Sequence, residues 1–154
     1  MLRRTFHTKC NSFNGAYTAY AYAWTGDIKT LPQAKLTCLF DTGSDIGMID
    51  IKTAQKLHIK KTDKLTLSDT AGGQTFSDIY IANICFPNGM AFKNRPLKGI
   101  DLPVGLIIGM DIISTGKFSM AKNNGNMRLS FSTNQYDFYI PHWKLPTEQF
   151  RESE

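Results

Sequence analysis

Apolar and polar residues alternate along most of the chain, which predicts a structure made mainly of strands. In AYTAYAYAW, residues 16–24, alanines alternate with aromatic rings, which predicts a strand that is bulged or packed on both faces. A second strand is expected over residues 34–40, AKLTCLF. Between the two, TGDIKTLPQ contains Pro32 and turn-forming residues, so we expect a loop there.

Two hairpins are predicted farther along the chain. Alternating runs within residues 63–86 flank Ala71, Gly72 and Gly73, which predicts a hairpin with a glycine tip. A second hairpin is expected over residues 117–132, because Asn-Asn-Gly at 123–125 is a strong turn signal.

Helix signals are few. Asp50 is a suitable N-cap for a short helix within IDIKTAQKLHI. The run LPVGLIIGMDIIS predicts a buried strand that leads into a helical turn after Gly109, with Asp111 capping that turn. The whole pattern predicts an all-β, barrel-like domain with one or two short helices and no internal repeats.

Length and composition fit one globular domain. The chain has 154 residues, of which 42% are hydrophobic and 20% are charged. We expect the domain to span residues 15–133, after an N-terminal extension over 1–14. A C-terminal tail over 134–154 mixes aromatic residues with prolines and ends in charged residues.

Charge, cysteines and hydropathy exclude several classes of function. The formal net charge is +5, but no block of five like charges occurs, so nucleic-acid binding is disfavoured. The three cysteines and three histidines lack the spacing of metal ligands, so we expect reduced thiols, no metal and no cofactor. No apolar run approaches the ~18–20 residues that span a bilayer, and no secretory signal is indicated. We therefore expect a cytoplasmic protein without a membrane partner.

The stretch LTCLFDTGSDIGMID carries the chemistry that stands out. An apolar strand runs into Asp41, and Thr42, Gly43 and Ser44 follow it. Backbone N–H groups and hydroxyls in such a turn favour the ionised carboxylate, and a glycine lets a peptide backbone approach closely. The plain alternative is a polar residue at the end of a strand.

Peptide hydrolysis by carboxylates needs two of them. One acts as a base on water while the other, protonated, donates to the scissile carbonyl. The chain offers one suitable turn, because Asp69-Thr70-Ala71 lacks both the glycine and the apolar lead-in. A symmetric homodimer would supply the second carboxylate on its two-fold axis.

LFDTGSD, followed by a hairpin with a glycine tip and then by LIIGMDII, resembles the retropepsins, the retroviral-type aspartic proteases with their cellular and bacterial relatives. The Gly-Met-Asp sequence, with GKFSM and NNGNMRLSFS after it, is most similar to the bacterial members. The resemblance covers roughly residues 15–133. It implies a retropepsin-like acid protease barrel with a homodimeric active site. The implied function is an aspartic endopeptidase that cleaves extended polypeptides between apolar residues.

The resemblance also implies roles for residues of the turn. Asp41 matches the catalytic aspartate. Thr42 matches the residue whose hydroxyl joins the two active-site loops across the dimer, and Gly43 the residue whose carbonyl binds the substrate backbone. Ser44 and Asp45 are expected to contribute to substrate binding.

Further along the chain, Ala71, Gly72 and Gly73 match the tip of the flap that closes over the peptide. Ile107, just before Ile108 and Gly109, is expected to line a specificity pocket.

The sequence departs from the retroviral pattern at two positions. Those enzymes usually carry alanine where Ser44 stands, and the serine hydroxyl is expected to stabilise ionised Asp41 and move the pH optimum to more acid values. They carry arginine where Met110 stands, so Asp45 lacks the partner that this arginine provides.

Two other function classes remain open at this point. A retropepsin-like domain can bind peptides or protein partners without cutting them, because a fold does not fix a function. A basic module that binds RNA or DNA is the weaker alternative. A strictly monomeric protein would favour the peptide-binding module, and salt-dependent retention on nucleic acid would favour the basic one.

Overall fold

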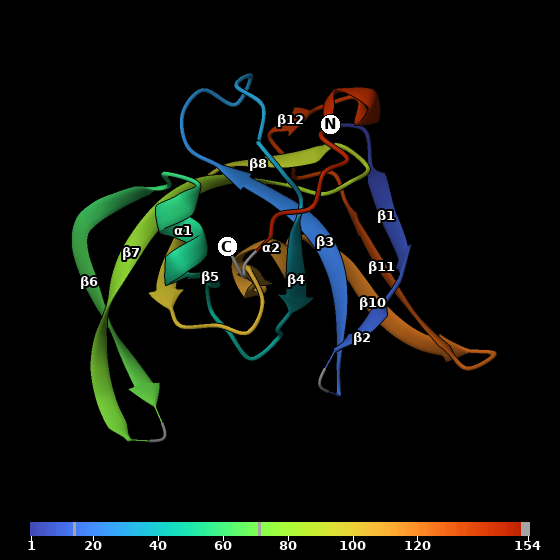
Figure 1. Ribbon diagram of the computed structural model, residues 1–154. Coiled ribbons are helices and arrows are strands. Elements are labelled where there is room, and N and C mark those ends of the chain that lie inside the picture. Colours follow the sequence, from blue (N-terminus) through green and yellow to red (C-terminus); the bar gives the residue numbers. More distant parts are fainter. Residues whose placement is uncertain (14, 71, 152–154) are drawn as a thin grey trace.

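Strands dominate the structure, as the alternation predicts (Figure 1). The computed structural model describes residues 1–13, 15–70 and 72–151. In chain order, its elements are β1 (Arg4–Lys9), β2 (Asn11–Phe13), β3 (Ala16–Trp24), β4 (Leu36–Phe40), β5 (Gly47–Asp50), α1 (Ile51–Lys56), β6 (Lys60–Thr70), β7 (Gly73–Cys85), β8 (Met90–Ile100), β9 (Leu106–Ile108), α2 (Met110–Ile113), β10 (Gly116–Asn123), β11 (Asn126–Thr133), β12 (Phe138–Tyr139) and the 3₁₀ turn η1 (His142–Lys144).

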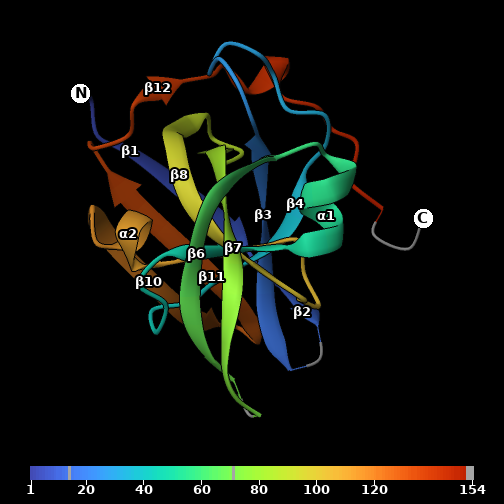
Figure 2. The same ribbon diagram turned by 90° about the vertical axis from the view of Figure 1, so that its left-hand side faces the viewer.

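The larger sheet closes into a barrel. Its strands follow the order β12-β8-β5-β9-β4-β3-β7-β6. In addition, β8 pairs with β7, which closes the part of this order that runs from β8 to β7. The strands β8, β5, β9, β4, β3 and β7 therefore form a ring. The hairpin of β6 and β7 extends from this ring, and β12 lies along β8 (Figure 2).

Strand β9 lies between β4 and β5 in the sheet, although β4 and β5 follow each other along the chain. It runs parallel to β4, with Phe40 opposite Ile108, and antiparallel to β5, with Met48 opposite Ile107. This insertion brings the segment after β4 against the segment after β9, although the two lie far apart in sequence.

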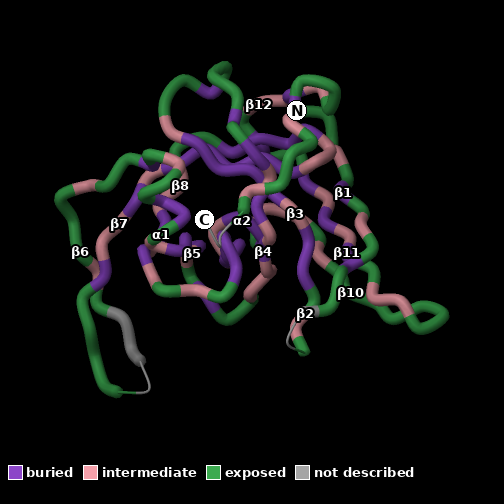
Figure 3. Tube along the Cα trace, in the orientation of Figure 1, coloured by how far each residue is buried: buried purple, intermediate pink, exposed green. Residues whose placement is uncertain are grey.

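Strand β3 is packed on both faces, which explains its alternation of alanines with rings. Ala19, Ala21 and Ala23 face the main core of the barrel, where small side chains fit close to neighbouring strands. Tyr22 and Trp24 face a second buried cluster, which includes residues of the C-terminal tail. Most of β3 is accordingly purple in Figure 3, as a strand covered on both faces should be.

A separate three-stranded sheet, in the order β1-β11-β10, packs against the barrel through aromatic rings. The ring of Phe40, at the end of β4, stacks on Phe86 at 5.6 Å and on Phe118 of β10 at 5.3 Å between centroids. Phe131 of β11 meets Phe86 edge to face at 5.8 Å. These rings fix the end of β4 relative to the smaller sheet.

Both terminal segments pair with strands inside residues 15–133. β1 runs antiparallel to β11, and β2 runs antiparallel to β3. The tail adds β12 to β8, and Lys35 forms an isolated parallel bridge with Gln149. The segments expected as extension and tail are therefore part of the folded sheets.

The caps of the two helices differ from each other. Asp50 is the N-cap of α1, as predicted, and one of its carboxylate oxygens accepts from the N–H and the hydroxyl of Thr53 at 3.1 and 3.0 Å. The predicted cap of the second helix is wrong: Gly109 occupies the N-cap of α2, and Asp111 lies within its first turn.

Candidate active site

The turn after β4 holds the carboxylate of Asp41 by donors from its own chain. The Asp41 N–H donates to the carbonyl of Ile108 at 2.9 Å, which continues the β4–β9 pairing by one residue. The Gly43 N–H donates to Oδ1 of Asp41 at 2.8 Å, and the Ser44 hydroxyl donates to Oδ2 at 3.2 Å. Both oxygens therefore accept a hydrogen bond from their own turn, which fixes the plane of the carboxylate.

The next residues of the turn are tied to α2. The N–H of Met110 donates to the carbonyl of Ser44 at 2.7 Å, and the N–H of Asp111 donates to the carbonyl of Asp45 at 3.0 Å. At Gly109, an added Cβ would lie only 2.5 Å from the carbonyl carbon of Ile46. A glycine is therefore required where the two backbones meet.

The residues of the turn differ in how far they are buried. Ser44 is buried, Asp41 is partly exposed, and Thr42, Gly43 and Asp45 are exposed. The buried serine supports the carboxylate from inside. The exposed residues leave their side chains and backbone accessible to a molecule that binds at the turn.

An apolar row lies beside the aspartate and crosses three strands. Leu39 of β4 is opposite Ile107 of β9, and Ile107 is opposite Met48 of β5. Paired residues point to the same face of a sheet, and Leu39 shares that face with Asp41, two residues later. We call Leu39, Ile107 and Met48 the apolar row. Ile107 is 9% exposed, whereas Leu39 and Met48 are partly exposed.

The sequence pattern singles out Ile107 but not its two neighbours. Leu39 could have been found, because it stands two residues before Asp41 in a strand. Met48 could not, because its position depends on the register between β5 and β9.

The hairpin predicted around residues 71–73 is the β6–β7 hairpin. Its strands pair as far as Thr70 opposite Gly73, and Gly72 and Gly73 are exposed. Ala71 lies outside the described residues. In Figures 1 and 2 this hairpin extends well beyond the body of the barrel, on the same lower side as the end of β4.

Asp111 is the most perturbed carboxyl of this region. Burial raises the pKa of Asp111, and the positive charge of Arg95 opposes that rise. Its Oδ1 and the Nε of Arg95 are both buried without a hydrogen-bond partner. The backbone N–H of Asp111 is the group that holds the carbonyl of Asp45.

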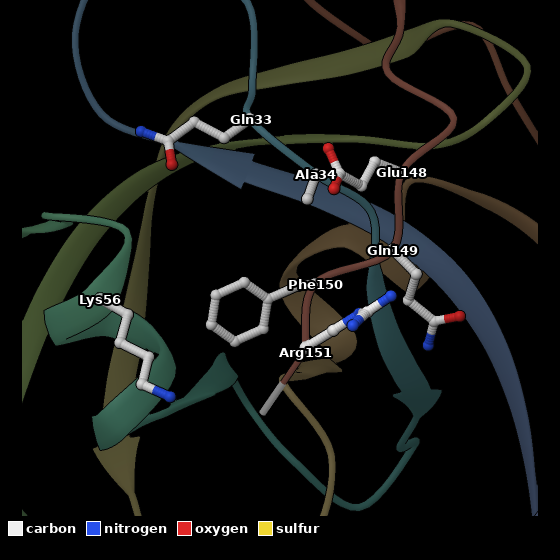
Figure 4. Close-up of a pocket in the computed structure, with 7 residues that line it drawn as sticks. All are labelled: Gln33, Ala34, Lys56, Glu148, Gln149, Phe150 and Arg151. Carbon is white, nitrogen blue, oxygen red and sulfur yellow. The ribbon is translucent and has the colours of Figure 1, made fainter. Parts of the chain in front are cut away.

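One cavity lies apart from the predicted site residues. It has a volume of about 610 Å³ and lies between α1 and the tail, where the tail crosses the barrel (Figure 4). Its lining includes Gln33, Lys56 and the tail residues Glu148, Phe150 and Arg151. Because Phe150 also packs against the main core, this cavity belongs to the attachment of the tail.

The described residues hold neither a cluster of metal ligands nor a membrane-spanning helix. Across residues 1–13, 15–70 and 72–151, His, Cys, Asp and Glu side chains form no group of three that could hold a metal ion. Over those ranges, no helix is both long enough and apolar enough to cross a bilayer.

Comparison with solved structures shows a likeness to a retropepsin-like aspartic protease from Rickettsia conorii. The TM-score is 0.56 and the sequences are 18% identical, with 86% of this chain and 96% of that chain covered. No protein family and no curated protein matches the sequence. At this identity the likeness shows the fold, so the expected all-β, retropepsin-like barrel is confirmed.

Proposed function

We propose that the protein is an aspartic endopeptidase that works as a homodimer, with one Asp41 from each chain. The observation that carries this proposal is the turn itself. Asp41 receives donors from Gly43 and Ser44, remains partly exposed, and lies beside the apolar row. Two such turns facing each other would place two carboxylates together. Two carboxylates at such a short distance cannot both ionise easily, so they share one proton.

The chemistry then needs no covalent intermediate. The ionised carboxylate accepts a proton from a water molecule, which attacks the scissile carbonyl. The protonated carboxyl of the other chain donates to the carbonyl oxygen. The resulting diol collapses as the C–N bond breaks, and the carboxyl that took the proton from water returns it to the leaving amine nitrogen. The exposed backbone of Gly43 and the apolar row would bind an extended peptide, with apolar side chains next to the cut.

The fold offers an edge for the second chain. β10 ends the order β1-β11-β10, and in the part of the chain that the structure describes no strand pairs with its outer edge. An unpaired edge can pair with its own copy across a two-fold axis. The β10–β11 turn, the end of β4 and the tip of the β6–β7 hairpin all lie on the lower side of Figure 1, where such a partner would meet all three.

The test is digestion of a complex peptide mixture from acid to neutral pH, read by mass spectrometry. Wild type is expected to cut between apolar residues, and Asp41→Asn is expected to lose these cuts. Asp101→Asn removes an exposed carboxylate elsewhere and serves as the matched control. Asp41→Asn chains mixed in excess into wild type should lower its activity, because mixed dimers hold one carboxylate.

The outcomes separate the two function classes. Activity that survives in Asp41→Asn would refute the proposal. A folded, dimeric wild type that cuts nothing at any pH would instead favour the peptide-binding module.

A further inference from the structure

The two faces of the β6–β7 hairpin differ in chemistry. Leu67 lies opposite Phe76, and Thr66 lies opposite Ser77. Side chains alternate along a strand, so Thr75 shares the face of Thr66 and Ser77, whereas Leu67 and Phe76 share the other. One face of the hairpin therefore carries hydroxyls and the other carries apolar side chains. We call Thr66, Thr75 and Ser77 the hydroxyl face.

Burial shows which face is turned toward the barrel. Ser77 is 6% exposed, whereas Phe76, its neighbour in the strand, is 70% exposed. On the opposite strand, Thr66 is partly buried and Leu67 is 48% exposed. At Ser77 and Thr66 the hydroxyl face is therefore the inner one, whereas Thr75, nearer the tip, is exposed. Hydrophobicity alone would instead place the apolar face against the body.

We infer that the hydroxyl face selects the substrate: at the second residue on either side of the cut, beyond the apolar residues that flank it, the enzyme prefers side chains that can hydrogen-bond to hydroxyls, such as Thr, Ser, Asn and Gln, over aliphatic ones of the same size. This inference rests on the proposed function. In the proposed enzyme the peptide lies between the apolar row, which takes the side chains next to the cut, and the hydroxyl face of the hairpin closed over it.

The physical reason is the cost of an unpaired hydroxyl. When the hairpin closes over a peptide, water leaves the space below it, and a hydroxyl without a partner loses its hydrogen bonds. A threonine side chain at this position offers a hydroxyl to Thr66 or Thr75. A valine of the same shape leaves these hydroxyls unpaired, and sites with polar groups discriminate against such analogues more strongly than apolar pockets do.

The experiment uses pairs of peptides that differ only by threonine against valine at the second residue on either side of an established cut. At one or more positions, the threonine peptide is expected to have a kcat/KM about fivefold higher, the effect of one hydrogen bond. Thr66→Val and Thr75→Val are expected to reduce this ratio. Because the ratio is measured within each variant, a partial loss of folded protein does not change it.

Phe76→Thr is the matched control, since it changes the same hairpin on its outer face and should leave the ratio unchanged. Cleavage that depends on Asp41 with equal or higher rates for the valine peptides would overturn the inference and leave the protease proposal standing. If no peptide is cut, the same pairs are compared by fluorescence polarisation. Tighter binding of the threonine peptides would then support the inference without catalysis, and equal binding would overturn it.

Discussion

The Ser44 hydroxyl and the Asp41 carboxylate form a hydrogen bond of 3.2 Å within one turn, and Ser44 is only 7% exposed. Because Gly43 occupies the other carboxylate oxygen, the plane of the Asp41 carboxylate is set inside one chain. A partner chain would therefore meet a carboxylate that is already oriented.

Removing the Ser44 hydroxyl should lower activity by loosening the catalytic carboxylate. Its hydrogen bond fixes Oδ2 of Asp41, so in Ser44→Ala only the Gly43 N–H orients the carboxylate. We expect kcat/KM to fall about tenfold, the effect of one hydrogen bond to a charged group. Ser44→Thr keeps a hydroxyl and should stay closer to wild type. Equal kcat/KM for Ser44→Ala and wild type would contradict this role.

Gly109→Ala should destabilise the protein and disturb the turn. The new Cβ would lie 2.5 Å from the carbonyl carbon and 2.6 Å from the oxygen of Ile46, and backbone atoms cannot rotate away. Overpacking of this kind costs about 1–3 kcal/mol of unfolding free energy. Denaturant unfolding measures the loss. Gly72→Ala is the matched control, since its Cβ meets nothing within 4 Å, and an equal loss in both variants would refute the explanation.

Asp50→Ala should cost about 2 kcal/mol of unfolding free energy, more than a simple helix cap. Besides the two donors of Thr53, the carboxylate accepts from the N–H of Leu102 at 3.1 Å, so it joins α1 to the loop before β9. Asp101→Ala, at an exposed position, should stay within about 0.5 kcal/mol of wild type. Equal stability of the two variants would contradict this role of Asp50.

Asp111→Asn should stabilise the protein at neutral pH but not in acid. Burial raises the pKa of Asp111 above its ordinary value of 3.8, so the folded chain binds that proton more tightly than the unfolded chain does. Wild-type stability therefore falls as pH rises from that value through the raised pKa. The amide does not titrate and escapes this loss. The measurement is the difference in unfolding free energy between variant and wild type across pH.

A difference that shrinks as pH rises would contradict this sign for Asp111. Asp101→Asn, at an exposed position, should show no such trend and serves as the control.

Features with local signals were predictable from the sequence. The strand of residues 16–24, the hairpin turn at 123–125 and the cap at Asp50 each depend on neighbours a few residues away, and the structure confirms them. The aspartate turn belongs to this group too, since its motif is contiguous.

Features that depend on distant pairing were not predictable. In β1 only one of six side chains is buried, so its hydrophobic pattern does not indicate a strand. β1 forms a strand because it pairs with β11, which is distant in sequence. β8 continues through the polar residues Lys93, Asn94 and Arg95, which read as a loop in isolation. Thr66 and Ser77 gain their importance only from the register of the β6–β7 hairpin and from the burial of one face.

The tail is fastened to the strand that leads to the aspartate. The N–H of Lys35 donates to the carbonyl of Glu148 at 3.0 Å, and the N–H of Phe150 donates to the carbonyl of Lys35 at 2.9 Å. Lys35 lies just before β4, which ends at Asp41. In mechanical terms, a force that pulls on the C-terminal tail would act first on these two hydrogen bonds and then directly on β4. The force would therefore reach the turn that carries the carboxylate before it reaches most of the barrel.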